Sequence, residues 1–141
     1  MKLDALITAF ETLTPETLPR LAALYAENAR FRDPFNDVQG RAAIEAIFRH
    51  MFAQVEAPRF VVRERVVDGA AAFLVWDFHF RRGGQAMTIH GGSHLKFDAD
   101  GRVSEHRDYW DAAEELYAHL PLIGPLMRWL QRRLSAASAR G

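Results

Sequence analysis

Three side chains have the types and spacing for acid–base chemistry: Asp33, His106 and Asp108. His106 and Asp108 stand two residues apart in a strand-like segment, so their side chains emerge about 7 Å apart on one face. That separation suits a pair that flanks a small ligand or shares a water. Asp33 begins an Asp-Pro step, where a carboxylate either acts as a base in a dry pocket or only caps a turn. Both interpretations stay open from the sequence.

Further side chains are candidates for holding a flat, apolar ligand near these polar groups. Aromatic rings stack on such ligands, although aromatic residues more often form an ordinary core. Ser93 would add a hydroxyl group, and either Ser93 or Tyr25 would donate to an oxyanion. The predicted ligand-binding residues are Tyr25, Trp76, Phe78, Ser93 and Trp110.

No cofactor or metal is expected. The sequence has no cysteine, which excludes disulfides, zinc ribbons, iron–sulfur clusters and cysteine nucleophiles. Asp77, His79, His90 and His94 fall on the opposite face of their strands from the candidate pocket. His90 and His94 are about 13 Å apart along an extended strand, too far to share one ion. We expect these residues to lie on a solvated or dimer-interface face.

The composition indicates one globular domain over residues 1–141, with a core at about 5–112 and a helical extension at 112–135. Eighteen basic and eighteen acidic residues cancel, which argues against nucleic-acid binding through a basic surface. No apolar run approaches the roughly 20 residues of a membrane-spanning helix. Acidic residues interrupt the N-terminal segment, so no signal peptide is predicted and the cytoplasm is the expected compartment.

The elements that must position these residues change in type halfway along the chain. Helical spacing of apolar residues predicts helices near 3–10, 14–25 and 41–51, with a short strand at 29–33. Leu24 and Tyr25 complete the apolar stripe of the second of these helices. The segregation of helices and strands indicates an α+β class.

Strands are predicted at 59–67, 70–80, 85–97 and 102–110, because Gly-containing turns separate four segments of alternating polarity. Three successive tight turns make an antiparallel meander. A last helical segment begins at 112, is interrupted at Pro121 and Gly124-Pro125, and ends near 134.

The turn at 98–101 predicts a register for the last hairpin. If it pairs Phe97 with Arg102, then Ser93 faces His106 and Gly91 faces Asp108, leaving open volume beside that glycine. The inward-facing residues on the last strand are then His106, Asp108 and Trp110. A buried His and Asp are costly unless hydrogen-bonded or wet, so we expect a sheet curled around a cavity with a small polar cluster.

Residues 24–34 (LYAENARFRDP) and 40–44 (GRAAI) resemble the signature of the nuclear transport factor 2-like superfamily. Its small-molecule branch includes ketosteroid isomerase, limonene epoxide hydrolase and SnoaL-like polyketide cyclases. The resemblance implies an α+β cone, in which a strongly curved antiparallel sheet wraps a pocket closed by N-terminal helices. It also implies a homodimer.

The resemblance implies roles for some residues and departs at others. Asp33 matches the general base of ketosteroid isomerase, and Asp108, with His106 beside it, matches the acid/base position of the polyketide cyclases. The oxyanion-hole tyrosine of ketosteroid isomerase falls near Ala9 or Phe10 here, and its late aspartate falls on Ser93. Both donors are replaced in this chain.

Three functions follow as hypotheses. The first is a cofactor-independent isomerase, cyclase or hydratase acting on an enolisable, apolar carbonyl compound. The second is a non-catalytic binding module that uses the same pocket, and the third is a protein-interaction module that uses the outer sheet face. The C-terminal helical segment is interpreted as a lid or a dimer contact, with a membrane-surface helix as the alternative.

Overall fold

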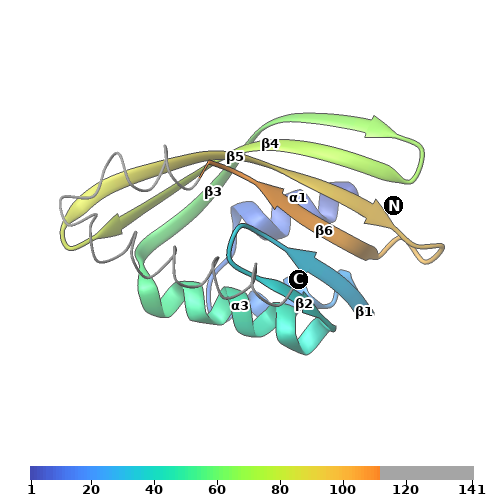
Figure 1. The fold of residues 1–141 in the computed structure, drawn as a ribbon, viewed down its shortest axis with the longest axis horizontal. Helices are drawn as coiled ribbons and strands as arrows, with labels where there is room; N and C mark the ends of the chain where they lie inside the picture. The colour runs from blue at the N-terminus through green and yellow to red at the C-terminus, as the bar shows by residue number, and fades with distance from the viewer. Residues whose placement is uncertain (112–141) are drawn as a thin grey trace, which may run out of the picture. The chain divides into compact units, whose positions relative to one another are not determined.

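The computed structural model describes residues 1–111, and the contacts within it group Met1–Trp110 into one compact unit (Figure 1). The C-terminal helical segment predicted above lies outside the described residues. The helices are α1 (Leu3–Glu11), α2 (Leu18–Ala22) and α3 (Arg41–Gln54). The strands are β1 (Tyr25–Arg32), β2 (Asp37–Gln39), β3 (Glu56–Asp68), β4 (Ala71–Arg82), β5 (Gln85–Phe97) and β6 (Val103–Tyr109). No helix of this part of the chain is long and apolar enough to cross a membrane.

The six strands form one sheet in the order β2-β1-β6-β5-β4-β3. The predicted meander is present as β3 to β6, and the predicted α+β fold with a curved sheet is confirmed. One detail differs, because β1 pairs with β6 in parallel and β2 adds an edge strand that sequence patterning missed. A three-residue strand carries too little alternation to be recognised.

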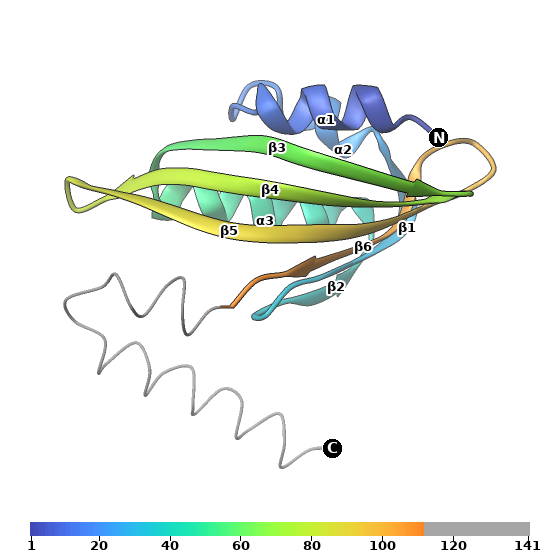
Figure 2. The ribbon, with the colours of Figure 1, turned by 90° about the horizontal axis from the view of Figure 1, so that it is seen from above.

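Helix α3 lies against the inner face of the curved sheet. It contacts β1 and β2 at one edge of the sheet, and β3, which follows α3 in the chain, at the other. Figure 2 shows α3 behind the strands and α1 beside β3. The apolar side chains of the inner sheet face and of α3 therefore surround a space instead of meeting directly.

The predicted helix through Tyr25 was wrong. Helix α2 ends at Ala22, and Tyr25 begins β1, where it pairs with Val103 and its side chain is fully buried. The Arg41 guanidinium donates hydrogen bonds of 3.0 and 2.6 Å to the Tyr25 carbonyl oxygen. Strand pairing and burial outweigh the local helical pattern here.

The predicted register of the last hairpin was wrong by two residues. Ser93 faces Asp108 and Leu95 faces His106, because the turn pairs Phe97 with Val103 and a bulge follows. The Asp98 carboxylate organises this turn by accepting the backbone N–H groups of Asp100 and Arg102. A two-residue shift preserves the inward face, so His106 is still buried on the inner side.

The open volume predicted beside Gly91 is absent. Gly91 pairs with Trp76 on β4, and a Cβ atom added to Gly91 would lie 2.6 Å from the Trp76 ring. The indole therefore occupies the space that the missing side chain leaves. The turns at Asp68-Gly69 and Gly83-Gly84 join antiparallel neighbours, and the second of them places Asp77 opposite His90.

Candidate functional site

A cavity of about 550 Å³ lies between α3 and the inner face of the sheet. This volume falls in the range of about 300–1,000 Å³ that is usual for small-molecule sites. Most of its wall is apolar and aromatic. The lining residues of that kind are Phe31, Val38, Ala43, Ala46, Ile47, Phe48, Met51, Phe60, Trp76, Phe78, Ile89 and Trp110. The polar side chains that line it, among residues 1–111, are Asp33, Asn36, His50 and Asp108.

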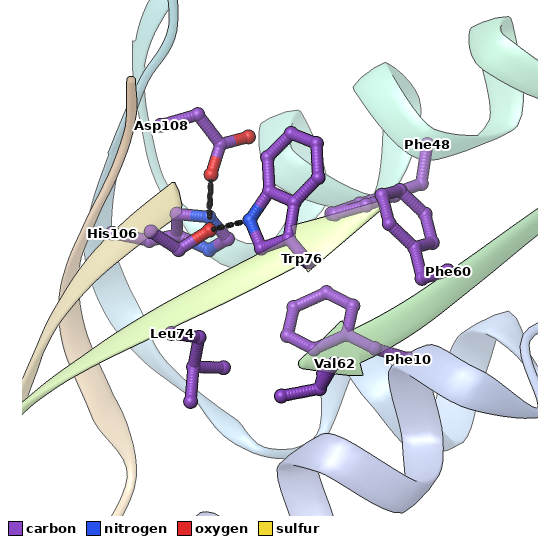
Figure 3. Close-up of a pocket in the computed structure, with 9 residues that line it drawn as sticks. Phe10, Phe48, Phe60, Val62, Leu74, Trp76, His106 and Asp108 are labelled. Atoms are coloured by element: carbon purple, nitrogen blue, oxygen red, sulfur yellow. Dashed lines mark hydrogen bonds and ion pairs between the residues drawn. The ribbon is translucent and has the colours of Figure 1, made fainter. Parts of the chain in front are cut away.

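A smaller recess of about 20 Å³ adjoins this cavity, and Figure 3 shows it. Its volume is enough for about one water molecule. Phe48, Phe60, Trp76 and Asp108 line both spaces, so they form the boundary between them. The recess is also lined by Phe10, Val62, Leu74, Ser93 and His106.

A chain of buried hydrogen bonds ends on one oxygen of Asp108. The Ser93 hydroxyl donates to Asp108 Oδ1 at 2.5 Å, and His106 Nε2 lies 2.6 Å from the same oxygen. The Trp76 indole N–H donates to Ser93 Oγ at 2.8 Å. The Tyr25 hydroxyl lies 2.7 Å from His106 Nδ1.

The direction of these hydrogen bonds follows from what each group can donate. Burial, and then the charge of Asp108, raise the pKa of Tyr25 well above its ordinary value, so its hydroxyl keeps its hydrogen. The Asp108 carboxylate can only accept, so His106 Nε2 carries a hydrogen, and in a neutral His106 ring Nδ1 then accepts the Tyr25 hydroxyl hydrogen. Each donor in the chain therefore points toward Asp108.

The second carboxylate oxygen of Asp108, Oδ2, accepts no hydrogen bond within residues 1–111. Both donors converge on Oδ1. The side chain is 17% exposed and lines the large cavity, whereas His106 is 2% exposed. Asp108 is thus the member of this network that a bound molecule can reach.

Asp33 faces the same cavity and also caps a turn. Its carboxylate accepts hydrogen bonds from the backbone N–H groups of Phe35 and Asn36 and from the Asn36 side-chain amide. Burial nevertheless raises the pKa of Asp33, and the charge of Asp108 raises it further against the lowering effect of those donors. The Asp33 carboxylate thus caps a turn and also lines the cavity, while its role as a base stays a prediction.

The predicted ligand-binding residues fall in three positions. Trp76, Phe78 and Trp110 line the large cavity, and Trp110 packs edge-on against Phe35 with ring centroids 5.4 Å apart. Ser93 lines the recess. Tyr25 lines neither space and lies behind His106, with stacked rings 5.9 Å apart. Its contact with the site runs through His106.

Several lining residues were missed by sequence reasoning. His50 lines the cavity one turn beyond Ile47, and this helical spacing was available as a signal. Asn36 reaches the cavity because its amide is held by Asp33, which no pattern indicates. Phe60 stacks on Phe78 at 4.5 Å, a cross-strand pair that depends on the register of β3 and β4.

The outer face of the sheet carries the remaining polar candidates. Asp77 accepts hydrogen bonds from His90 at 2.5 Å and from Arg63 at 2.8 Å, and these bonds lower its pKa. His79 hydrogen-bonds to Thr88 across the strands. In residues 1–111, no group of three or more His, Asp or Glu side chains is placed to hold a metal ion.

Comparison with known proteins shows similarity over most of the chain. The sequence model of the SnoaL-like domain family matches residues 6–106. A steroid delta-isomerase from Nocardioides simplex is 34% identical over 96 residues, which cover 64% of this chain and 73% of the isomerase.

Solved structures share the fold at low sequence identity. One is a hypothetical protein from Catenulispora acidiphila, of ketosteroid isomerase-like fold and in complex with trimethylamine. It has a TM-score of 0.70 and 15% identity, over 82% of this chain and 88% of that chain. Another is an LEH-like epoxide hydrolase from M. tuberculosis, with a TM-score of 0.65 and 18% identity over 99% of this chain and 93% of that chain.

Proposed function

The chain belongs to the SnoaL-like domain family, and we propose that it is a cofactor-independent enzyme that moves a proton on an apolar carbonyl compound. The observation that carries this proposal is that Asp33 and Asp108 line one largely apolar cavity. Two carboxylates in different environments suit opposite roles in proton transfer. The likeness to a steroid delta-isomerase supports the same class of reaction.

Asp33 is the proposed base. A base works best when its pKa lies near the working pH, and burial moves the pKa of Asp33 in that direction. In the proposed step, the Asp33 carboxylate takes a proton from the carbon next to the carbonyl group, and the C–H electron pair forms an enolate. The protonated Asp33 then returns the proton to the same or another carbon, which completes the exchange or isomerisation.

Asp108 and His106 position the substrate or return the proton in this scheme. Ser93 and His106 stabilise the negative charge of Asp108 through Oδ1, which keeps Oδ2 as a fixed acceptor facing the cavity. The Trp110 indole N–H and the His50 ring have no hydrogen-bond partner within residues 1–111, so either can donate to a substrate oxygen.

A non-catalytic binding module is the second candidate. The Tyr25 and Ser93 hydroxyls, the two oxyanion donors considered from sequence, are both engaged in the network around Asp108. An enolate would therefore lack those two donors, whereas simple binding requires neither. A homodimer and a cytoplasmic location are further proposals that rest on the resemblance.

Deuterium uptake from heavy water into a panel of enolisable apolar ketones, read by mass spectrometry, tests the proposal. We expect uptake with the native chain, a loss of at least about 100-fold in Asp33→Asn, and a smaller loss in Asp108→Asn. Asp77→Asn is the matched control, because Asp77 is similarly exposed but lies on the outer sheet face. Loss only in Asp108→Asn would move the base to β6, and uptake by no ketone would favour the binding module.

A further inference from the structure

Within residues 1–111, the side chains that line the cavity include two carboxylates and no lysine or arginine. The two carboxylates are those of Asp33 and Asp108. A carboxylate that faces apolar walls loses hydration, and hydrogen bonds or a nearby cation offset the free-energy cost of this loss. The charge of Asp108 also raises the pKa of Asp33, although less than burial does.

Hydrogen bonds from the protein reach only part of these carboxylates. Asp33 accepts neutral donors, the backbone N–H groups of its turn and the Asn36 amide. Asp108 accepts the Ser93 hydroxyl and the His106 Nε2–H, both on Oδ1. Oδ2 of Asp108 has no donor within the described part of the chain.

The walls offer aromatic faces beside the carboxylates. Phe60 and Phe78 stack with an interplanar angle of 10°, and Trp76 meets Phe60 edge-on at 5.8 Å. Trp110 directly follows β6, two residues after Asp108, and lines the same cavity. The faces of tryptophan and phenylalanine rings attract cations, more strongly where water is excluded.

We infer that this cavity binds a ligand with a positively charged nitrogen, held by Asp33 and Asp108 and packed against the aromatic wall. The ligand supplies the counter-charge that the lining residues lack, and its apolar part fills the remaining volume. The inference rests on the proposed function in taking this cavity as the substrate site. Taken together, the proposed reaction and the inferred positive charge indicate an apolar amino ketone as the substrate class.

A pair of isosteric probes tests the inference with the full chain. Benzyldimethyl(2-hydroxyethyl)ammonium and 3,3-dimethyl-4-phenylbutan-1-ol differ only in having a charged nitrogen or a carbon at the centre. Isothermal titration calorimetry at neutral pH is expected to show the ammonium compound binding at least about tenfold more tightly. The anion 4-phenylbutanoate is expected to bind more weakly than both.

Single-residue variants test which carboxylates cause the preference for the ammonium probe. Asp33→Asn and Asp108→Asn should each reduce the ratio of the two affinities severalfold, while Asp77→Asn on the outer face should leave it unchanged. Circular dichroism and thermal melting confirm that each variant is folded. Equal or tighter binding of the neutral alcohol to the native chain would overturn the inference, as would a ratio that survives in both cavity variants.

The deuterium assay separates this inference from the proposed function. Ketone exchange without a preference for the ammonium probe would overturn the inference and leave the proposed reaction standing. A clear ammonium preference without exchange in any ketone or amino ketone would support the inference and count against the reaction.

Discussion

The chemistry of single residues here depends on what each is hydrogen-bonded to. Asp33 and Asp108 are the same residue type in the same cavity, yet their environments differ. Asp33 is held by a turn and its pKa is raised by burial, whereas Asp108 receives two side-chain donors on one oxygen. Tyr25 never reaches the cavity and acts on it only by orienting His106.

Asp33→Asn is expected to change how stability depends on pH. Because the pKa of Asp33 is raised in the folded chain, its contribution to stability is complete below the unfolded value of about 3.9 and is lost as pH rises through the folded value. The variant lacks this contribution, and the asparagine oxygen can still accept the N–H groups of the turn. Relative to the native chain, Asp33→Asn should therefore be more stable at pH 7 than at pH 3.

Urea unfolding of both proteins from pH 3 to 7 measures this difference directly. The Asp100→Asn variant, in the exposed turn after β5, serves as the control and should show no comparable trend. A difference that moves in the opposite direction with pH would show that burial does not dominate the titration of Asp33.

Tyr25→Phe is expected to remove the preference of the His106 ring for the tautomer with hydrogen on Nε2. The substitution removes the hydroxyl that donates to Nδ1 and leaves that nitrogen unsatisfied in a buried site, at a cost of about 1–3 kcal/mol. Nitrogen-15 NMR of the ring should show hydrogen on Nε2 in the native chain and a mixture of tautomers in the variant. Ring shifts that are identical in both proteins would contradict the proposed direction of the hydrogen bonds.

At the scale of elements, close packing between neighbouring strands determines the positions of the side chains in the site. Gly91 on β5 lies against the Trp76 ring on β4, and Gly92 lies against Phe73 on the other face. The Trp76 position in turn decides whether its indole N–H reaches Ser93. The lack of a side chain at Gly91 is therefore part of the geometry of the network around Asp108.

Gly91→Ala is expected to displace the Trp76 indole and destabilise the fold by about 1–3 kcal/mol. The added Cβ would meet the outer ring of the indole, which a phenylalanine at position 76 lacks. Gly91→Ala should therefore lower the free energy of unfolding by less in the Trp76→Phe background than in the native chain. A double-mutant cycle measured by urea unfolding tests this difference. Equal costs in both backgrounds would mean that the indole is not what restricts position 91.

At the scale of the whole molecule, the three hypotheses of an enzyme, a binding module and a protein-interaction module differ in whether they need a ligand in the cavity. Enzyme and binding module both predict stabilisation by a small ligand, because a molecule that binds only the folded chain raises its stability. An interaction module predicts stabilisation by a protein partner instead. The outer sheet face carries ion pairs such as Arg63 with Asp77 and Lys96 with Glu105, in contrast to the apolar cavity.

The ammonium probe at about 100 times its Kd should add about 2.7 kcal/mol to the free energy of unfolding of the native chain. Thermal melting at increasing probe concentration measures the effect, with the neutral alcohol at equal concentration as the control. An unchanged Tm at concentrations that saturate the calorimetric signal would show that the probe binds outside the folded cavity.

Local patterns in the sequence were enough for the class of fold and the inward face of β6. Gly-containing turns and period-two alternation place His106 and Asp108 on the buried side, because a shift of two residues leaves each side chain on the same face. The family signature at 24–34 and 40–44 indicated the superfamily, which the match to residues 6–106 confirms. Their proposed catalytic roles stay predictions.

The tertiary structure alone decided which groups meet. The bulge between Lys96 and Phe97 brings Ser93 opposite Asp108, and pairing of β1 with β6 places Tyr25 in a strand behind His106 and not in the predicted helix. The joining of β1 to β6 and the crossing of α3 over the sheet enclose Asp33 and Asp108 in one cavity. The contact between Tyr25 and His106 joins residues 81 positions apart. The energies of such contacts depend on packing that no local pattern encodes.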